Sequence, residues 1–208
     1  MVYLHGLMAN LLKMASKGDV EGVRKYLKKS GAKINSTDSD GQTALHCGAK
    51  GGHVDVCREL LASVANVDAE DSKHRTSLLI AVENNRAKVA KLLCEAGAST
   101  SVACPADGYT PLHIAAKKGF VECAEVLLQH GAPIDGNPDK WGNLPEDSCA
   151  VSEIRVLITM ARQERATADA AGCPPPYNPH AATAPPPTEE YKRDMNNHHA
   201  SSPEASPS

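Results

Sequence analysis

The sequence predicts an all-α fold made of stacked helical repeats, on three observations. Three similar segments contain threonines at positions 43, 76 and 110, which are 33 and 34 residues apart. Nine residues after each threonine stands a residue suited to ending a helix: Gly52, Asn85 or Gly119. Aromatic residues make up only 3% of the 208 residues, so the interior must consist of Leu, Val, Ile and Ala in thin layers.

Each segment carries the signals of two short helices joined by a turn. Thr110 can cap a first helix whose first position is Pro111, where the missing N–H is not needed. An apolar stripe at helical spacing follows, and residues 121–129 predict a second helix with Cys123 among its inward positions. Residues 38–41, Asp-Ser-Asp-Gly, predict the turn between repeats.

The run Thr110-Pro-Leu-His-Ile-Ala-Ala-Lys-Lys-Gly119 resembles the ankyrin repeat, because several anchor positions of that family recur together at fixed offsets. The resemblance implies a solenoid of helix-turn-helix units with β-hairpin-like turns. We expect three full repeats at 38–70, 71–104 and 105–138, and degenerate caps at 8–37 and 139–162, which together make one domain over 8–162. In the last copy, Glu146 and Asp147 stand where Leu-His is expected.

The resemblance also implies a partner-binding surface on the concave side, formed by the turn tips and the exposed side of the first helices. The positions that match are Asp40, Gln42, Lys50, Lys73, Arg75, Ile80, Glu83, Asp107, Tyr109, Ile114, Lys117, Trp141 and Asn143. Ile80 and Ile114 hold equivalent places and either form an exposed apolar strip or pack between repeats. His46 and His113 hold the place where the family uses an imidazole to brace the repeat.

The C-terminal segment 163–208 is rich in Pro, Ala and Ser and is predicted to be disordered. Within it, Pro174, Pro175, Pro176 and Tyr177 spell Pro-Pro-x-Tyr, which resembles a ligand of WW domains such as those of HECT-type ubiquitin ligases. Chance is the competing explanation, since a proline-rich tail that contains tyrosine forms this tetrapeptide easily. Ser202 and Ser206 resemble proline-directed phosphorylation sites.

Charge and motifs argue against several other classes of protein. The net charge of −3 gives no overall basic field for nucleic acid, and no run of about 18 apolar residues predicts a membrane span. Residues 1–35 carry a net charge of +5, which indicates either a solvated face or a docking patch for an acidic partner. Seven cysteines without a Cys-x-x-Cys pair indicate free thiols in a reducing compartment. We find no active site, metal site or cofactor motif.

We therefore expect a non-enzymatic, monomeric protein-interaction module inside the cell, in the cytoplasm, the nucleus or both. In the adaptor hypothesis, the solenoid binds one protein and the tail recruits a WW-domain protein. The alternative is a nuclear regulator that masks or assists a transcription or chromatin factor through the repeats. The identity of the partner is beyond the reach of the sequence, because repeat folds host many functions.

Overall fold

The computed structural model describes residues 11–29, 33–135 and 137–170, and these residues form helices joined by loops and turns. Residues 11–17 form a helix that precedes the labelled ones. The labelled helices are α2 Val20–Leu27, α3 Ala44–Gly51, α4 Val54–Ala62, α5 Ser77–Glu83, α6 Ala87–Glu95, α7 Pro111–Lys118, α8 Val121–Gln129 and α9 Ser152–Ala170. The only β-type pairing among these residues is an isolated bridge between Glu70 and Thr76, so the all-α prediction is confirmed.

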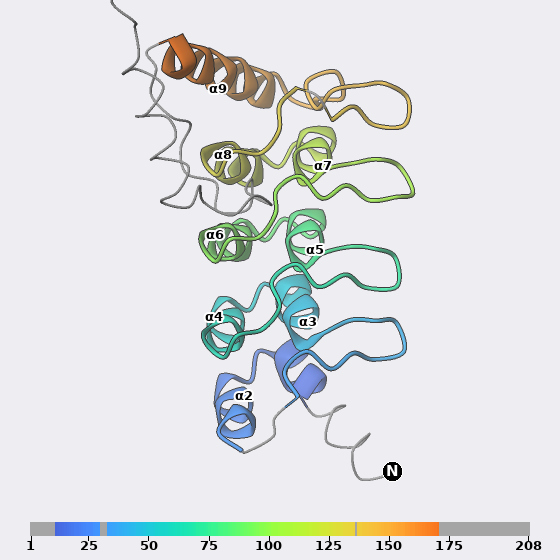
Figure 1. Cartoon of the computed structure of the whole chain (residues 1–208), viewed down its shortest axis with the longest axis vertical. Coiled ribbons are helices and arrows are strands. Elements are labelled where there is room, and N and C mark those ends of the chain that lie inside the picture. The colour runs from blue at the N-terminus through green and yellow to red at the C-terminus, as the bar shows by residue number, and fades with distance from the viewer. Residues whose placement is uncertain (1–10, 30–32, 136, 171–208) are drawn as a thin grey trace, which may run out of the picture. The chain divides into compact units, whose positions relative to one another are not determined.

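The helices stack as two columns, one for each helix of the repeat (Figure 1). The first helices α3, α5 and α7 contact one another in sequence order, and the second helices α2, α4, α6, α8 and α9 do the same. Between repeats the chain leaves the columns as an extended loop with a turn at its tip, and these tips form a row beside the first helices (Figure 1). The chain therefore buries its core between neighbouring repeats, as a solenoid does.

The predicted start and stop signals act where the sequence places them. Thr43, Thr76 and Thr110 are the N-caps of α3, α5 and α7, and Thr76 Oγ1 accepts the backbone N–H of Leu79 at 3.3 Å. Gly52 and Gly119 end α3 and α7 in the left-handed conformation, with φ of 80° and 71°. Asn85 takes the same conformation after α5, with φ of 54°, because asparagine tolerates it better than most residues.

The core is aliphatic and built from small residues, as the shortage of aromatics predicts. Among the described aromatic residues, Tyr26 alone is buried, on the inward side of α2. Cys57, Cys94 and Cys123 are buried at second-helix positions, and burial raises the pKa of the Cys57 thiol to about 12. These thiols therefore act as small apolar groups that pack between helices.

The last repeat departs from the predicted pattern at two places. Residues 145–148 form turns where the other repeats have a first helix, and the Asp147 carboxylate accepts the Leu144 N–H at 2.8 Å. Helix α9 continues to Ala170, eight residues beyond the domain boundary predicted at residue 162. Arg165 is the physical reason, since its guanidinium donates to the carbonyl oxygens of Ala132 at 2.9 Å and Leu128 at 3.3 Å.

Several predictions fall on residues outside the described ranges. They are the disorder of 171–208, the Pro174–Tyr177 motif, and the phosphorylation sites Ser202 and Ser206. Within residues 11–29, 33–135 and 137–170, no helix is long and apolar enough to cross a lipid bilayer.

Val64 lies in a backbone conformation that a β-branched residue rarely adopts. It follows α4 with φ of 65°, and its side chain is 83% exposed. Glycine holds the equivalent place after α6 and α8, where Gly97 and Gly131 have φ of 89° and 77°. For an L-residue other than glycine, this conformation costs about 1–2 kcal/mol.

We expect Val64→Gly to raise the free energy of unfolding by about 1 kcal/mol, because the strain removed exceeds the extra chain entropy of glycine. Urea unfolding followed by circular dichroism measures this change. The reciprocal variant Gly131→Val is the matched control, because open space surrounds Gly131 and only the backbone strain would change. Gly131→Val should lower the free energy of unfolding. An increase in that variant would contradict the assignment of strain to this backbone position.

Candidate protein-binding surface

Four turn tips line one side of the stack, and three of them are built around an aspartate. The tips are residues 38–42, 71–75, 104–109 and 139–143. In the first, Asp38 Oδ1 accepts the backbone N–H groups of the residues two and four positions later, at 2.9 Å each. Asp71 and Asp139 do the same at 2.8–2.9 Å, and both are buried. An aspartate bound in this way fixes the turn that follows it.

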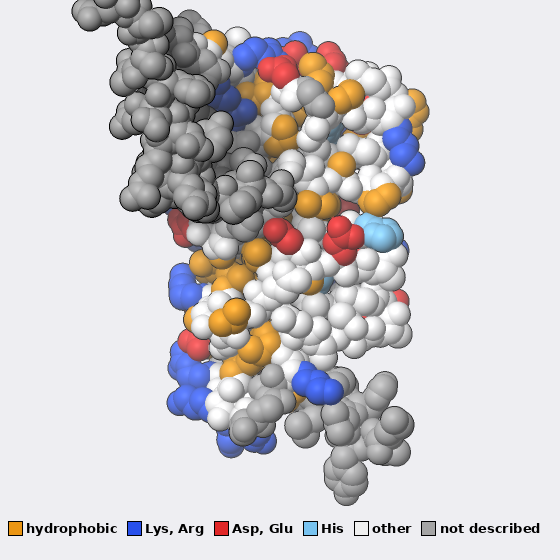
Figure 2. Space-filling view, viewed as in Figure 1, with side chains coloured by type: hydrophobic (Ala, Val, Ile, Leu, Met, Phe, Trp, Pro, Cys, Tyr) orange, Lys and Arg blue, Asp and Glu red, His pale blue; other side chains and the backbone are white. Residues whose placement is uncertain are grey.

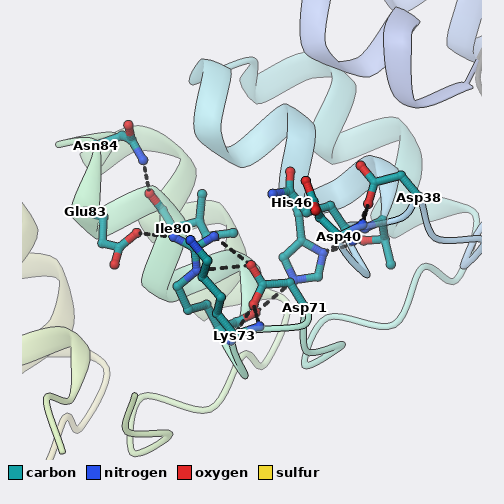
Figure 3. A network of polar contacts seen from close by, with 11 residues as sticks. Asp38, Asp40, His46, Asp71, Lys73, Ile80, Glu83 and Asn84 are labelled. Carbon is teal, nitrogen blue, oxygen red and sulfur yellow. Dashed lines mark hydrogen bonds and ion pairs between the residues drawn. The ribbon is translucent and has the colours of Figure 1, made fainter. Parts of the chain in front are cut away.

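Two buried histidines tie a first helix to the tip of the next repeat, where the resemblance implied only that they brace the repeat. In the first full repeat, Nδ1 of His46 accepts the Thr43 N–H at 3.0 Å. Its Nε2 therefore carries the proton and donates to the Arg75 carbonyl at 3.1 Å (Figure 3). His113 repeats the arrangement with Thr110 and with the Asn143 carbonyl, at 3.3 and 3.2 Å.

A charged network fixes the second tip against α5. The Arg75 guanidinium pairs with Asp71 at 2.7 Å and with Glu83 at 3.1 Å (Figure 3). Burial alone would raise the pKa of Asp71, but the hydrogen bonds from Arg75 and from the backbone outweigh it and hold that pKa below its usual value. The pair therefore stays charged at neutral pH.

Neighbouring tips are also joined by backbone hydrogen bonds, but only in pairs. The Ser72 N–H donates to the Asp40 carbonyl at 2.9 Å, and the Lys140 N–H donates to the Asp107 carbonyl at 3.1 Å. Glycine makes this approach possible, because a Cβ on Gly41 would lie 2.8 Å from the Ser72 nitrogen. No such bond joins the second tip to the third, although the structure describes both.

The junction between the second and third tips differs from the others in three ways. His74, with φ of 55°, stands where the first, third and fourth tips have glycine, and its Cβ keeps the next backbone away. The third tip closes from Cys104 to Tyr109, one residue longer than the others, and contains no bracing aspartate. Leu79 stands where the neighbouring repeats have a bridging histidine. Both links between repeats are thus missing at one junction.

A groove of about 400 Å³ lies beside this junction, and no residue of the second tip, 71–75, is part of its lining. We call it the inter-tip groove, and its lining comes from α5, the third tip and α7: Glu83, Cys104, Asp107, Tyr109, Ile114, Lys117 and Lys118. Lys118 spans it and donates to the Glu83 carbonyl at 2.8 Å. The lining therefore combines apolar and aromatic side chains with two acidic and two basic ones, a mixture that protein-binding sites often have.

An aromatic cluster borders the groove. Tyr109 stacks on His113 with ring centroids 5.8 Å apart. The ring of Trp141, on the fourth tip, lies 5.9 Å from the ring of Tyr109, centroid to centroid. The Lys117 ammonium donates to the Tyr109 hydroxyl at 2.9 Å, and this bond raises the pKa of Lys117. Trp141, the one tryptophan of the chain, is 65% exposed. Exposed, rigidly held aromatic rings are typical anchors of protein interfaces.

The structure gathers five of the thirteen predicted partner-binding residues in the inter-tip groove, and Trp141 beside it. The five are Glu83, Asp107, Tyr109, Ile114 and Lys117. The others lie along the row of tips and α3, away from the groove lining: Asp40, Gln42, Lys50, Lys73, Arg75 and Asn143. Ile80 lies on α5.

The exposed apolar strip of Ile80 and Ile114 is not formed. Their exposures are 2% and 7%, because the first helices approach closely enough to bury these positions, as the packing alternative expected. Sequence reasoning also missed Cys104 and Lys118, which line the groove. The signals for the open junction were His74 and Leu79, each a departure from a motif letter that the adjacent repeats keep.

The basic N-terminal repeat presents its lysines to solvent. Lys13, Lys17, Lys25, Lys28 and Lys29 are exposed, and none of them forms an ion pair with a carboxylate of the described residues. Figure 2 shows Lys and Arg side chains gathered at this end of the stack. Arg24 is engaged instead, in pairs with Glu21 at 2.7 Å and Glu59 at 2.6 Å.

The stacked helix pairs with their row of tips define a solenoid of the protein-binding class. The family models "Ankyrin repeats (3 copies)" and "Ankyrin repeat" match residues 11–104 and 107–139. The chain belongs to the ankyrin-repeat family, whose repeats are a protein-binding module.

Known relatives of very different size share these repeats. Cyclin-dependent kinase inhibitor 2A of Monodelphis domestica is 30% identical over 159 residues, which are 76% of this chain and 92% of that protein. Tyrosine-protein kinase Shark of Drosophila melanogaster is 33% identical over 129 residues, 62% of this chain but 14% of the kinase. The Nuclear factor NF-kappa-B p105 subunit of Gallus gallus is 33% identical over 121 residues, 57% of this chain and 12% of that protein. The chain thus spans only a small part of the two larger relatives.

Asp139 should control the mobility of the aromatic anchor. In Asp139→Ala the N–H groups of Trp141 and Asn143 lose their acceptor, so we expect the fluorescence anisotropy of Trp141 to fall. Asp38→Ala is the matched control, since it removes the same brace from the first tip and should leave the tryptophan signal unchanged. Equal effects of the two variants would show that the brace does not act locally.

Acid should destabilise the fold through the two histidine bridges. Burial lowers the pKa of His46 and of His113, so near pH 6.5 and below the unfolded chain binds protons that the folded chain does not. The free energy of unfolding should therefore fall as the pH drops from 7.5 to 5.5. In His46→Asn/His113→Asn most of this dependence should vanish, although stability at pH 7.5 is lower. An unchanged slope in that variant would assign the effect to other groups.

Proposed function

We propose that the protein is an adaptor that holds one protein partner in the inter-tip groove and recruits a WW-domain protein through Pro174–Tyr177. The observation that carries the first half is the convergence of Tyr109, Ile114 and Lys117 on one groove, next to the exposed Trp141. The second half rests on the sequence of the tail alone.

The groove favours a partner segment that offers an apolar side chain next to an acidic one. The apolar side chain would enter between Tyr109 and Ile114, while a carboxylate would reach Lys117 at the rim. Aromatic rings with a neighbouring lysine suit such a segment, because the rings supply contact area at a low entropy cost.

A nuclear regulator is the second candidate, and one comparison favours it. The matched part of NF-kappa-B p105 belongs to a protein named as a nuclear factor. A related idea comes from cyclin-dependent kinase inhibitor 2A, which this chain covers over most of its length and whose name denotes an inhibitor. In both cases the stack would act by covering a surface of its partner.

Parallel affinity captures with the full chain and with two sets of variants test the adaptor. Tyr109→Ala/Trp141→Ala should weaken binding of the groove partner by about 30-fold or more in the dissociation constant, which corresponds to about 2 kcal/mol. Tyr177→Ala should abolish binding to a panel of purified WW domains and leave the groove partner bound. Gln129→Ala, at an exposed position on α8, is the control.

The outcomes separate the two candidates. The adaptor is supported if Tyr109→Ala/Trp141→Ala loses the groove partner and Tyr177→Ala loses the WW domains. A groove partner without any WW binding, together with a nuclear fraction of the protein in cells, supports the regulator. Partners that survive the groove variant exclude the groove as the binding site.

A further inference from the structure

The C-terminal end of the stack exposes apolar side chains that an end repeat would normally replace with polar ones. Five large apolar residues are exposed among the described residues, and one of them is Val64. The other four belong to the last repeat: Trp141, Val151, Val156 and Met160. A terminal repeat needs a polar outer face for solubility, so this concentration points to an interface.

Helix α9 carries an uncharged stripe along its exposed side. The stripe consists of exposed residues spaced by three or four positions: Ser152, Val156, Thr159, Met160, Gln163 and Thr167. Val156 and Met160 form its centre, with exposures of 56% and 55%. The Thr159 and Thr167 hydroxyls donate to carbonyls of α9 itself, at 2.9 and 2.8 Å. Both hydroxyls can therefore be buried at an interface without losing a partner.

The repeat register shows what kind of object fits this stripe. Met160 holds the place that Leu92 holds in α6 and Val126 in α8, at steps of 34 residues. Leu92 and Val126 are half-buried and pack against the core, and each of their helices contacts the following second helix. Helix α9 has no following second helix among the described residues, so Met160 lacks the neighbouring helix that accompanies its counterparts in α6 and α8.

The other end of the stack does not fit the stripe, because it presents lysines such as Lys13, Lys17 and Lys28. A second α9 offers edges of complementary charge. Along α9, Arg155 lies on one side of the stripe, and Glu153 and Glu164 lie on the other. Two α9 helices that run parallel would place the Arg155 side of each copy against the glutamate side of the other.

We propose that two copies of this chain associate through α9, stripe against stripe, in a two-fold symmetric dimer. The interface is separate from the inter-tip groove and leaves it open in both copies. It replaces the expectation of a monomer with a monomer–dimer equilibrium.

The size of the stripe sets the expected strength. Residues 152–167 span about 24 Å of helix, so one helix pair buries less than the roughly 1,200 Å² of a standard interface. We therefore expect a dissociation constant in the range of about 10–100 μM. Each protomer would exchange its partner readily at low concentration.

Sedimentation velocity of the full chain between 2 and 300 μM tests the dimer. The weight-average mass should rise from one chain toward two across this range. Val156→Glu/Met160→Glu should remain a monomer throughout, because it buries two carboxylates against each other. Val64→Glu is the matched control, since it makes the same change at an exposed valine far along the chain, and it should associate like the original. Equal circular dichroism spectra show that all three are folded.

Two results would overturn the proposal: a monomer at every concentration, or a dimer that the α9 variant does not weaken. The parallel arrangement has its own test in Arg155→Glu, which places like charges along both edges and should weaken association about tenfold. Adding Glu153→Arg, the position about 3 Å along the axis from Arg155 in a parallel pair, should restore it. A dissociation constant that Arg155→Glu leaves unchanged would overturn the parallel pairing.

Discussion

The hydrogen bond from a buried histidine to the carbonyl of the next tip is the contact on which the row of tips depends. His46 and His113 each satisfy the N–H of their own N-cap threonine and reach into the following repeat. One side chain thus fixes both the start of a helix and the position of the neighbouring tip. Where Leu79 replaces the histidine, the backbone bond between tips is missing as well, and the inter-tip groove lies beside that junction.

Much of this architecture depends on short-range interactions and can be predicted from the sequence. Thr43, Thr76 and Thr110 cap helices, and Gly52 and Gly119 end them, because each effect depends on one residue and its immediate neighbours. The burial of Cys57, Cys94 and Cys123 follows from helical periodicity in the same way. The candidate tip residues were predictable by position in the repeat.

What could not be predicted depends on contacts between repeats. The burial of Ile80 and Ile114 is set by how closely α3, α5 and α7 approach, which no single repeat determines. The length of α9 depends on Arg165, whose guanidinium binds carbonyls some 35 positions earlier in the chain. The groove lies where three features coincide: His74 and Leu79 depart from the motif in one repeat, and the tip of the next repeat, residues 104–109, is one residue longer.

The open junction also has a thermodynamic meaning. In a linear array, stability is close to a sum of the contribution of each repeat and of its interface with its neighbour. An interface without a histidine bridge and a backbone bond lacks two hydrogen bonds, each worth about 1 kcal/mol. The tips thus form two coupled pairs with a weak link between them. A ligand that contacts both Glu83 and Tyr109 would connect the two pairs of repeats. Its binding would therefore make the two pairs unfold more cooperatively.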